Sequence, residues 1–102
     1  MANIEQARKG VLMRILEGEG GASPAQRRAA FDNAGVPEPL RTLVEKVAKK
    51  AHRVTDDDVA AARATGLSED QIFEIVICAA IGEANRQFEQ AMVAVEAVTG
   101  KE

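Results

Sequence analysis

Aromatic residues are scarce in this sequence, which has three Phe and neither Tyr nor Trp among 102 residues. A chain without an aromatic platform lacks the usual means of stacking bases or sugars. The formal net charge of −3 also removes the general attraction to nucleic acid and to anionic membrane surfaces. The longest apolar run, residues 75–81, is far shorter than the roughly 20 residues of a membrane span. Composition therefore disfavours nucleic acid and membrane as partners.

Cysteine and histidine occur once each, as Cys78 and His52. A single cysteine excludes an internal disulfide and fits a reducing compartment, and the first residues do not resemble a signal peptide. We therefore expect a cytoplasmic protein. One Cys and one His cannot form a structural zinc site, and the Glu-x-x-His pairs of di-iron bundles are missing. We expect neither a metal nor another cofactor.

The residues that are abundant favour helices. Apolar residues make up 46% of the chain, mostly Ala, Val, Ile and Leu, and they recur at helical spacing. Glycines, prolines and capping residues divide the chain into about five helices in one all-α domain, near residues 3–16, 25–34, 39–52, 56–64 and 69–98. Residues 1–21 form the first helix and a glycine-rich link, residues 23–54 two helices, and residues 55–102 a helix, a turn and a long helix. Asn3 is the expected N-cap of the first helix and Gly35 the expected C-cap of the second.

The long last helix is the dominant feature. A capping box from Ser68 to Gln71 starts it, and no proline follows. Residues 72–81 are apolar at nearly every position, which predicts burial on all sides. Beyond Gly82 the apolar residues narrow to a seam with a period near 3.5, which we call the predicted seam. It consists of Phe88, Ala91, Met92, Val95 and Val98.

A helix of about 30 residues would be about 45 Å long, whereas a compact domain of this size has a radius of gyration near 13 Å. Either the helix breaks at Gly82, or its second half packs on another subunit. We favour the second alternative. The predicted seam is then the interface of a homo-oligomer.

A basic stripe is expected near the end of the third helix. Lys46, Lys49, Lys50 and Arg53 are spaced at i, i+3, i+4 and i+7, so they share one helical face where the dipole favours cations. A solvated face explains this pattern. The functional interpretation is a docking patch for an acidic protein partner.

Residues 59–72 also have the spacing of a helix-turn-helix, with small Ala62, Gly66 and apolar Ile72 at the expected intervals. In that motif the start of the second helix meets bases and phosphates. Here that start carries Glu69 and Asp70, whose carboxylates would repel phosphate. A DNA-binding regulator therefore stays a lesser alternative.

Residues 56–76 read DDDVAAARATGLSEDQIFEIV. This run resembles the carboxymuconolactone decarboxylase and alkylhydroperoxidase D superfamily, in which a helix with an A-x-x-A-G-L-S-like ending precedes an acidic-capped helix rich in Ile, Val and Ala. The resemblance extends over residues 40–91. It implies an alkylhydroperoxidase D-like all-α fold that assembles into trimers or hexamers.

Peroxide-reducing members of that superfamily use a C-x-x-C dithiol followed by a His, with an upstream Glu in a proton relay. Counting back from Gly66 places the two cysteines near Ala51 and Val54 and the His near Asp58, so all three are missing. Pro39 falls near the position of the upstream Glu, with Glu38 and Glu45 as imperfect neighbours. Because a dithiol–disulfide cycle needs two thiols, the resemblance supports fold and assembly and weakens the inferred activity.

Three residues remain as candidates for catalysis: Cys78, His52 and Glu45. Cys78 has only apolar neighbours in sequence, which favours a packing role over a reactive thiolate. His52 follows two lysines at a helix end, where we expect solvation. Spacing alone does not show whether these side chains meet.

We therefore expect a non-peroxidatic, homo-oligomeric scaffold or accessory subunit. Two alternatives stay open beside the scaffold. The first is an enzyme, either a thiol peroxidase using Cys78 or a decarboxylase-type lyase with a pocket between subunits. The second is the DNA-binding regulator.

Overall fold

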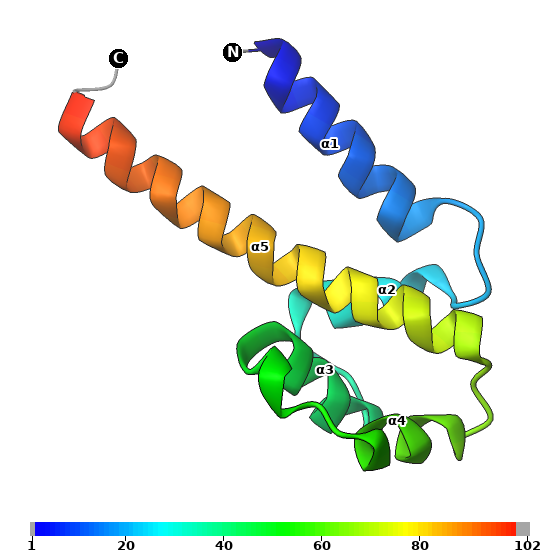
Figure 1. Ribbon diagram of the computed structural model, residues 1–102. Coiled ribbons are helices and arrows are strands. Elements are labelled where there is room, and N and C mark those ends of the chain that lie inside the picture. Colours follow the sequence, from blue (N-terminus) through cyan, green and yellow to red (C-terminus); the bar gives the residue numbers. More distant parts are fainter. Residues whose placement is uncertain (1, 100–102) are drawn as a thin grey trace.

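The computed structural model describes residues 2–99, and the side chains from residue 4 onward. Within that range the chain forms five α-helices and one 3₁₀ turn and contains no strand (Figure 1). The elements are α1 (Ala2–Glu17), α2 (Pro24–Asp32), α3 (Leu40–Lys49), η1 (Ala51–Arg53), α4 (Asp56–Arg63) and α5 (Glu69–Thr99). The expected all-α fold with a long C-terminal helix is confirmed. Among these elements no helix combines the length and apolar character needed to cross a bilayer.

Side-chain caps set the starts of three helices, including the capping box that the sequence predicted from Ser68 to Gln71. Ser23 accepts from the backbone N–H of Gln26, and Thr55 accepts from that of Asp58, each within a reciprocal capping box. At the start of α5, Ser68 Oγ accepts from the Gln71 N–H at 3.1 Å, and Gln71 Oε1 accepts from the Ser68 N–H at 2.8 Å. Each box satisfies two N–H groups that the helix itself leaves unpaired.

Some predicted helix ends are wrong. Helix α1 already includes Asn3, which is therefore not its N-cap. The left-handed residue that ends α2 is Asn33, with φ of 52°, and not Gly35, because asparagine tolerates this conformation better than most residues. Helix α3 stops at Lys49 instead of His52, since the chain turns at Lys50 into η1.

The core forms where α2 and α3 pack against the first half of α5 (Figure 1), and α1 contacts α2. Its most deeply buried large side chains are Leu43, Val44, Ile75 and Cys78. Leu16 from α1, Phe31 from α2 and Ala62 from α4 also belong to it. Aliphatic side chains therefore make up nearly all of the core.

Helix α5 is continuous through Gly82, so the alternative of a break there is wrong. A Cβ at this position would lie 2.0 Å from the carbonyl oxygen of Phe31, near the C-terminal end of α2. The same oxygen accepts a hydrogen bond of 2.6 Å from Arg86 Nη1, one turn further along α5. At Gly82, α5 thus approaches the backbone of α2 more closely than a side chain would allow.

The expectation that residues 72–81 are buried on all sides is also wrong. Ile72, Ile75 and Ala79 are buried, but Phe73 is 64% exposed and Ala80 is exposed. The physical reason is that too few helices pack around α5 to cover all of its sides. The other helices contact one side of α5 and leave its opposite side open, so an all-apolar helix is only half covered.

Candidate functional site

The three candidate catalytic residues lie in different environments. Cys78 is 1% exposed in the core, where its Sγ lies 3.9 Å from the carbonyl oxygen of Ile15. His52 is exposed in η1, and Glu45 is exposed on α3 beside a surface hollow that neither of the other two lines. A buried thiol and an exposed imidazole do not form a nucleophile–base pair. The structure therefore does not bring them together.

The environment of Cys78 keeps its thiol protonated. Burial raises the pKa of Cys78, and the nearby guanidinium of Arg27 only partly opposes that rise. Arg27 itself is 4% exposed and donates to the carbonyl oxygens of Ala22, at 3.1 Å, and Ile15, at 3.0 Å. Its hydrogen bonds thus pair with one carbonyl oxygen in the last turn of α1 and one in the link that follows. A thiol with a raised pKa and no access to solvent is a poor nucleophile.

We accordingly predict that Cys78 reacts slowly with an alkylating reagent in the folded protein. Its labelling at pH 7 should be at least about 100-fold slower than in denaturant, because reaction needs an opening of the core and a deprotonated thiol. Mass spectrometry of timed iodoacetamide samples measures both rates. Comparable rates in the two conditions would contradict a packing role and favour the thiol-enzyme alternative.

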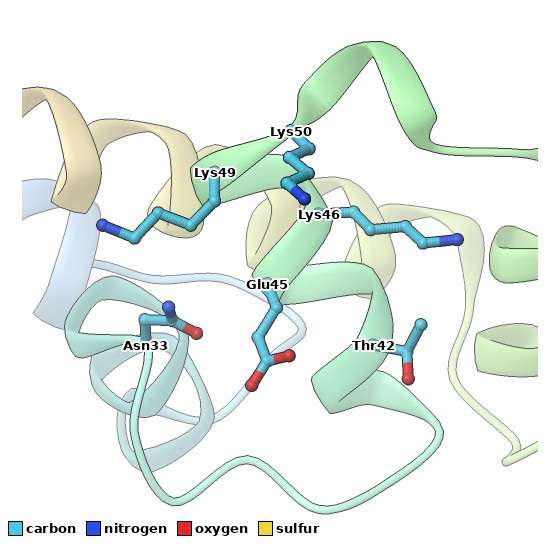
Figure 2. A pocket seen from close by; sticks show the side chains of 6 residues that line it. All are labelled: Asn33, Thr42, Glu45, Lys46, Lys49 and Lys50. Atoms are coloured by element: carbon cyan, nitrogen blue, oxygen red, sulfur yellow. The ribbon is translucent and has the colours of Figure 1, made fainter.

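The predicted basic stripe is divided by ion pairs. Lys46 Nζ lies 2.8 Å from Asp58 Oδ2 on α4, and Lys49 Nζ lies 3.0 Å from Glu83 Oε1 on α5. These bonds lower the pKa of both carboxyl groups. Figure 2 shows the two lysines extending in opposite directions from α3.

Lys50 and Arg53 form no ion pair within residues 2–99. Because α3 ends at Lys49, Arg53 also leaves the helical face that the i+7 spacing assumed. The hollow in Figure 2 is about 320 Å³ in volume and is lined by Asn33, Thr42, Glu45 and the three lysines. Fewer cations than the sequence suggested are thus available to an acidic partner.

The helix-turn-helix spacing corresponds to an actual turn. Ala62 is fully buried, Gly66 has a left-handed φ of 101°, and Ile72 is buried. Glu69, at the start of α5, forms a 2.9 Å ion pair with Arg63. The turn geometry is therefore explained by packing between α4 and α5, and its exposed end carries the carboxylates noted above.

A clamp that the sequence did not reveal joins α5 to the link before α2. Glu74 Oε2 accepts from the N–H of Gly21 at 3.0 Å, and Oε1 accepts from that of Ala22 at 2.8 Å. Gln71 adds a bond of 2.9 Å to the carbonyl oxygen of Gly21. The two backbone donors lower the pKa of Glu74. The only signal in the sequence was that Glu74 is the one charged residue of a long apolar run.

We predict that Glu74→Gln destabilises the fold by about 1.5 kcal/mol at pH 7, because an amide offers one acceptor where the carboxylate offers two charged ones. Because the pKa of Glu74 is lowered in the folded state, its carboxylate stabilises the protein at pH values above the ordinary pKa of 4.5. That stabilisation is lost as the pH falls through the lowered pKa. Urea unfolding of both proteins from pH 7 to pH 3 should therefore show a difference that shrinks with acid. Glu96→Gln, on an exposed part of α5, is the matched control and should show none.

The largest uncovered apolar feature runs along α5 on the side away from the core. Its residues alternate at spacings of four and three, and we call them the α5 stripe. They are Ile77, Ile81, Ala84, Phe88, Ala91, Val95 and Val98. The first two are partly buried and the other five are exposed, as is Met92 beside them. Every residue of α5 from Gln87 to Thr99 is exposed.

An apolar groove of about 400 Å³ adjoins the α5 stripe where α1 passes α5. Val11 and Leu12 line its α1 side, and Ile81, Ala84 and Phe88 line its α5 side. The guanidinium of Arg8 lies 4.9 Å from the centre of the Phe88 ring and donates to Asn85. Figure 1 shows α1 and the outer half of α5 diverging beyond this point. Together the groove and the stripe form the best candidate for a binding surface.

Comparisons with known proteins identify no relative. No protein-family model, no curated protein and no solved structure matches the chain. Within residues 2–99, no three Cys, His, Asp or Glu side chains are grouped so that they could hold a metal ion. The uncovered α5 stripe therefore remains the feature from which a function can be inferred.

Proposed function

We propose that this chain is a non-catalytic subunit of a homo-oligomer, acting as a helical scaffold or accessory subunit. The observation that carries the proposal is the exposed outer half of α5. Its apolar residues form one continuous face that is exposed from Phe88 to Val98, and Arg8 of α1 contacts that face only at its inner end, over the Phe88 ring. Fully burying a side chain such as Val or Phe contributes about 1.5–3 kcal/mol, and burial of several such side chains on this face supports association.

The extent of the surface supports the same proposal. The chain exposes 6704 Å², whereas a compact monomer of 10.9 kDa exposes about 5,600 Å². The excess of about 1,100 Å² exceeds the roughly 800 Å² that each partner buries in a standard interface. The radius of gyration of 15.4 Å also exceeds the roughly 13 Å of a compact domain. A second subunit on the outer half of α5 would reduce this exposed surface.

We further propose that the subunit is a non-peroxidatic member of the carboxymuconolactone decarboxylase and alkylhydroperoxidase D superfamily, with the alkylhydroperoxidase D-like fold. The support is the resemblance over residues 40–91, together with a short helix, a turn at Gly66 and a long helix in the implied order. The resemblance implies trimers or hexamers. The single, buried thiol at Cys78 supports the absence of peroxidase chemistry.

The dependence of thermal unfolding on protein concentration tests the assembly. Association stabilises the folded state by mass action. The midpoint temperature of unfolding should therefore rise steadily as the chain concentration is raised roughly a hundredfold, from about 1 to about 100 µM. A monomeric protein of the same composition would unfold at one temperature throughout. A constant midpoint would therefore count against the proposal.

A further inference from the structure

We infer that the α5 stripe binds the same stripe of a second copy of this chain, with the two helices antiparallel about a two-fold axis. The inference rests on the proposed homo-oligomer and adds the identity, direction and register of the contact. Three independent features of α5 support it: the spacing of its apolar residues, the distribution of its charges, and the alternation of large and small side chains.

The spacing is that of a coiled coil. The α5 stripe places apolar residues at alternating intervals of four and three over residues 77–98, which is three heptads and about 32 Å of helix. Such residues insert as knobs into holes between four residues of a facing helix. Core residues of α5, such as Ile75, Ala79 and Gly82, occupy the opposite side. Within the described residues, α1 borders the stripe only near Ile81, Ala84 and Phe88, so a helix that faces its outer part has to come from outside the protomer.

The charges of α5 avoid the stripe. Between residues 77 and 98 the helix has four charged side chains, Glu83, Arg86, Glu89 and Glu96, and helical spacing places all four on the remaining faces. Glu83 and Arg86 bind Lys49 and the Phe31 carbonyl of their own protomer. The positions that flank the stripe are uncharged, as in Gln87 and Ala94. Helix α5 itself therefore contributes no charge to the stripe, which fits a buried contact, and the charged neighbour at its inner end is Arg8 of α1 beside Phe88.

The alternation of side-chain size selects the antiparallel direction. In an antiparallel pair, Phe88 faces Ala91 of the second copy, Val95 faces Ala84, and Ile81 faces Val98, all in one register. Two of these three pairs match a large side chain with a small one, which keeps the helices evenly spaced. In a parallel pair each residue would face its own copy, so two Phe88 rings would crowd between pairs of alanines.

The rest of the protomer leaves room for this contact. Helices α2, α3 and α4 contact the first half of α5, and α1 diverges from its outer half (Figure 1). The second copy would fill the open side of α5 and reach the groove beside Val11 and Phe88. A two-fold contact also produces even-numbered assemblies, a dimer or a hexamer, in preference to a trimer.

Disulfide cross-linking of two single substitutions, Ala84→Cys and Val95→Cys, tests direction and register together. Both positions are exposed in the protomer, and the native Cys78 is buried. In the inferred pair residue 84 faces residue 95, whereas two copies of residue 84 lie about 16 Å apart along the axis. A disulfide needs Cα atoms within about 7 Å. One variant carries a size tag, and the two are refolded together before mild oxidation.

The expected result is a mixed Ala84→Cys/Val95→Cys product on a non-reducing gel, with little product from either variant alone. Val93→Cys is the matched control, because Val93 is exposed on the same helix but off the stripe, and it should cross-link to neither. Self-linked products of each variant would overturn the antiparallel direction. An oligomeric mass without the mixed product would overturn the inference and leave the proposed function standing, whereas a monomeric mass would overturn both.

Discussion

Replacing Gly82 with alanine is expected to destabilise the fold by about 3 kcal/mol or more. The added Cβ would meet the backbone oxygen of Phe31 at 2.0 Å, and a backbone atom at a helix end cannot move aside without shifting α2. Overpacking of this kind typically costs about 1–3 kcal/mol and occasionally more. The shift would also lengthen the bond between Arg86 and the same oxygen. Urea unfolding monitored by circular dichroism measures the change.

Gly10→Ala is the matched control for this prediction. Gly10 lies inside α1, and a Cβ added there would have no atom within 4 Å. Helix propensity alone then acts, and it favours alanine by about 1 kcal/mol. The same chemical change should therefore stabilise the protein at residue 10 and destabilise it at residue 82. A neutral or stabilising Gly82→Ala would show that α2 and α5 are not in close contact.

Val95→Glu is expected to weaken self-association by at least about 100-fold, equivalent to about 2.8 kcal/mol. Val95 is 50% exposed in the protomer, so the protomer tolerates a carboxylate there. In the assembly the carboxylate would be buried against an apolar helix without a partner, which costs several kcal/mol. Sedimentation velocity over a range of concentrations measures the change in the dissociation constant.

Val93→Glu provides the comparison, because it makes the same substitution two residues away. Val93 is 66% exposed but lies off the α5 stripe. Its replacement should leave the dissociation constant within about twofold and the helix content unchanged, as expected for a surface substitution. Equal weakening by both variants would mean that general charge, and not the stripe, governs association.

The parts of the fold that local residues determine were predictable from the sequence. Ser68 and Gln71 satisfy the start of α5 by themselves, and Thr55 does so for α4 with a residue three positions away. The same holds for Cys78, whose apolar neighbours in sequence already indicated a packing role. The predicted seam also came from local periodicity. Its residues are exposed in the protomer, and their role in an interface remains a prediction.

The features that were missed depend on partners far away in the sequence. The role of Gly82 is set by Phe31, and that of Glu74 by the link at Gly21, so neither could be recognised from adjacent residues. The basic stripe was overestimated for the same reason, since Lys46 and Lys49 find their carboxylates on α4 and α5. The burial of residues 72–81 was overestimated because the pattern shows which side chains are apolar but not how many helices cover them.

The mass of the unmodified chain in solution tests the central claim most directly. Size exclusion coupled to light scattering at micromolar concentration should give a whole-number multiple of 10.9 kDa, and the two-fold contact requires that multiple to be even. Val93→Glu should give the same mass, and Val95→Glu a smaller one. A single species of 10.9 kDa for the unmodified chain at these concentrations would contradict the claim that α5 joins one subunit to another.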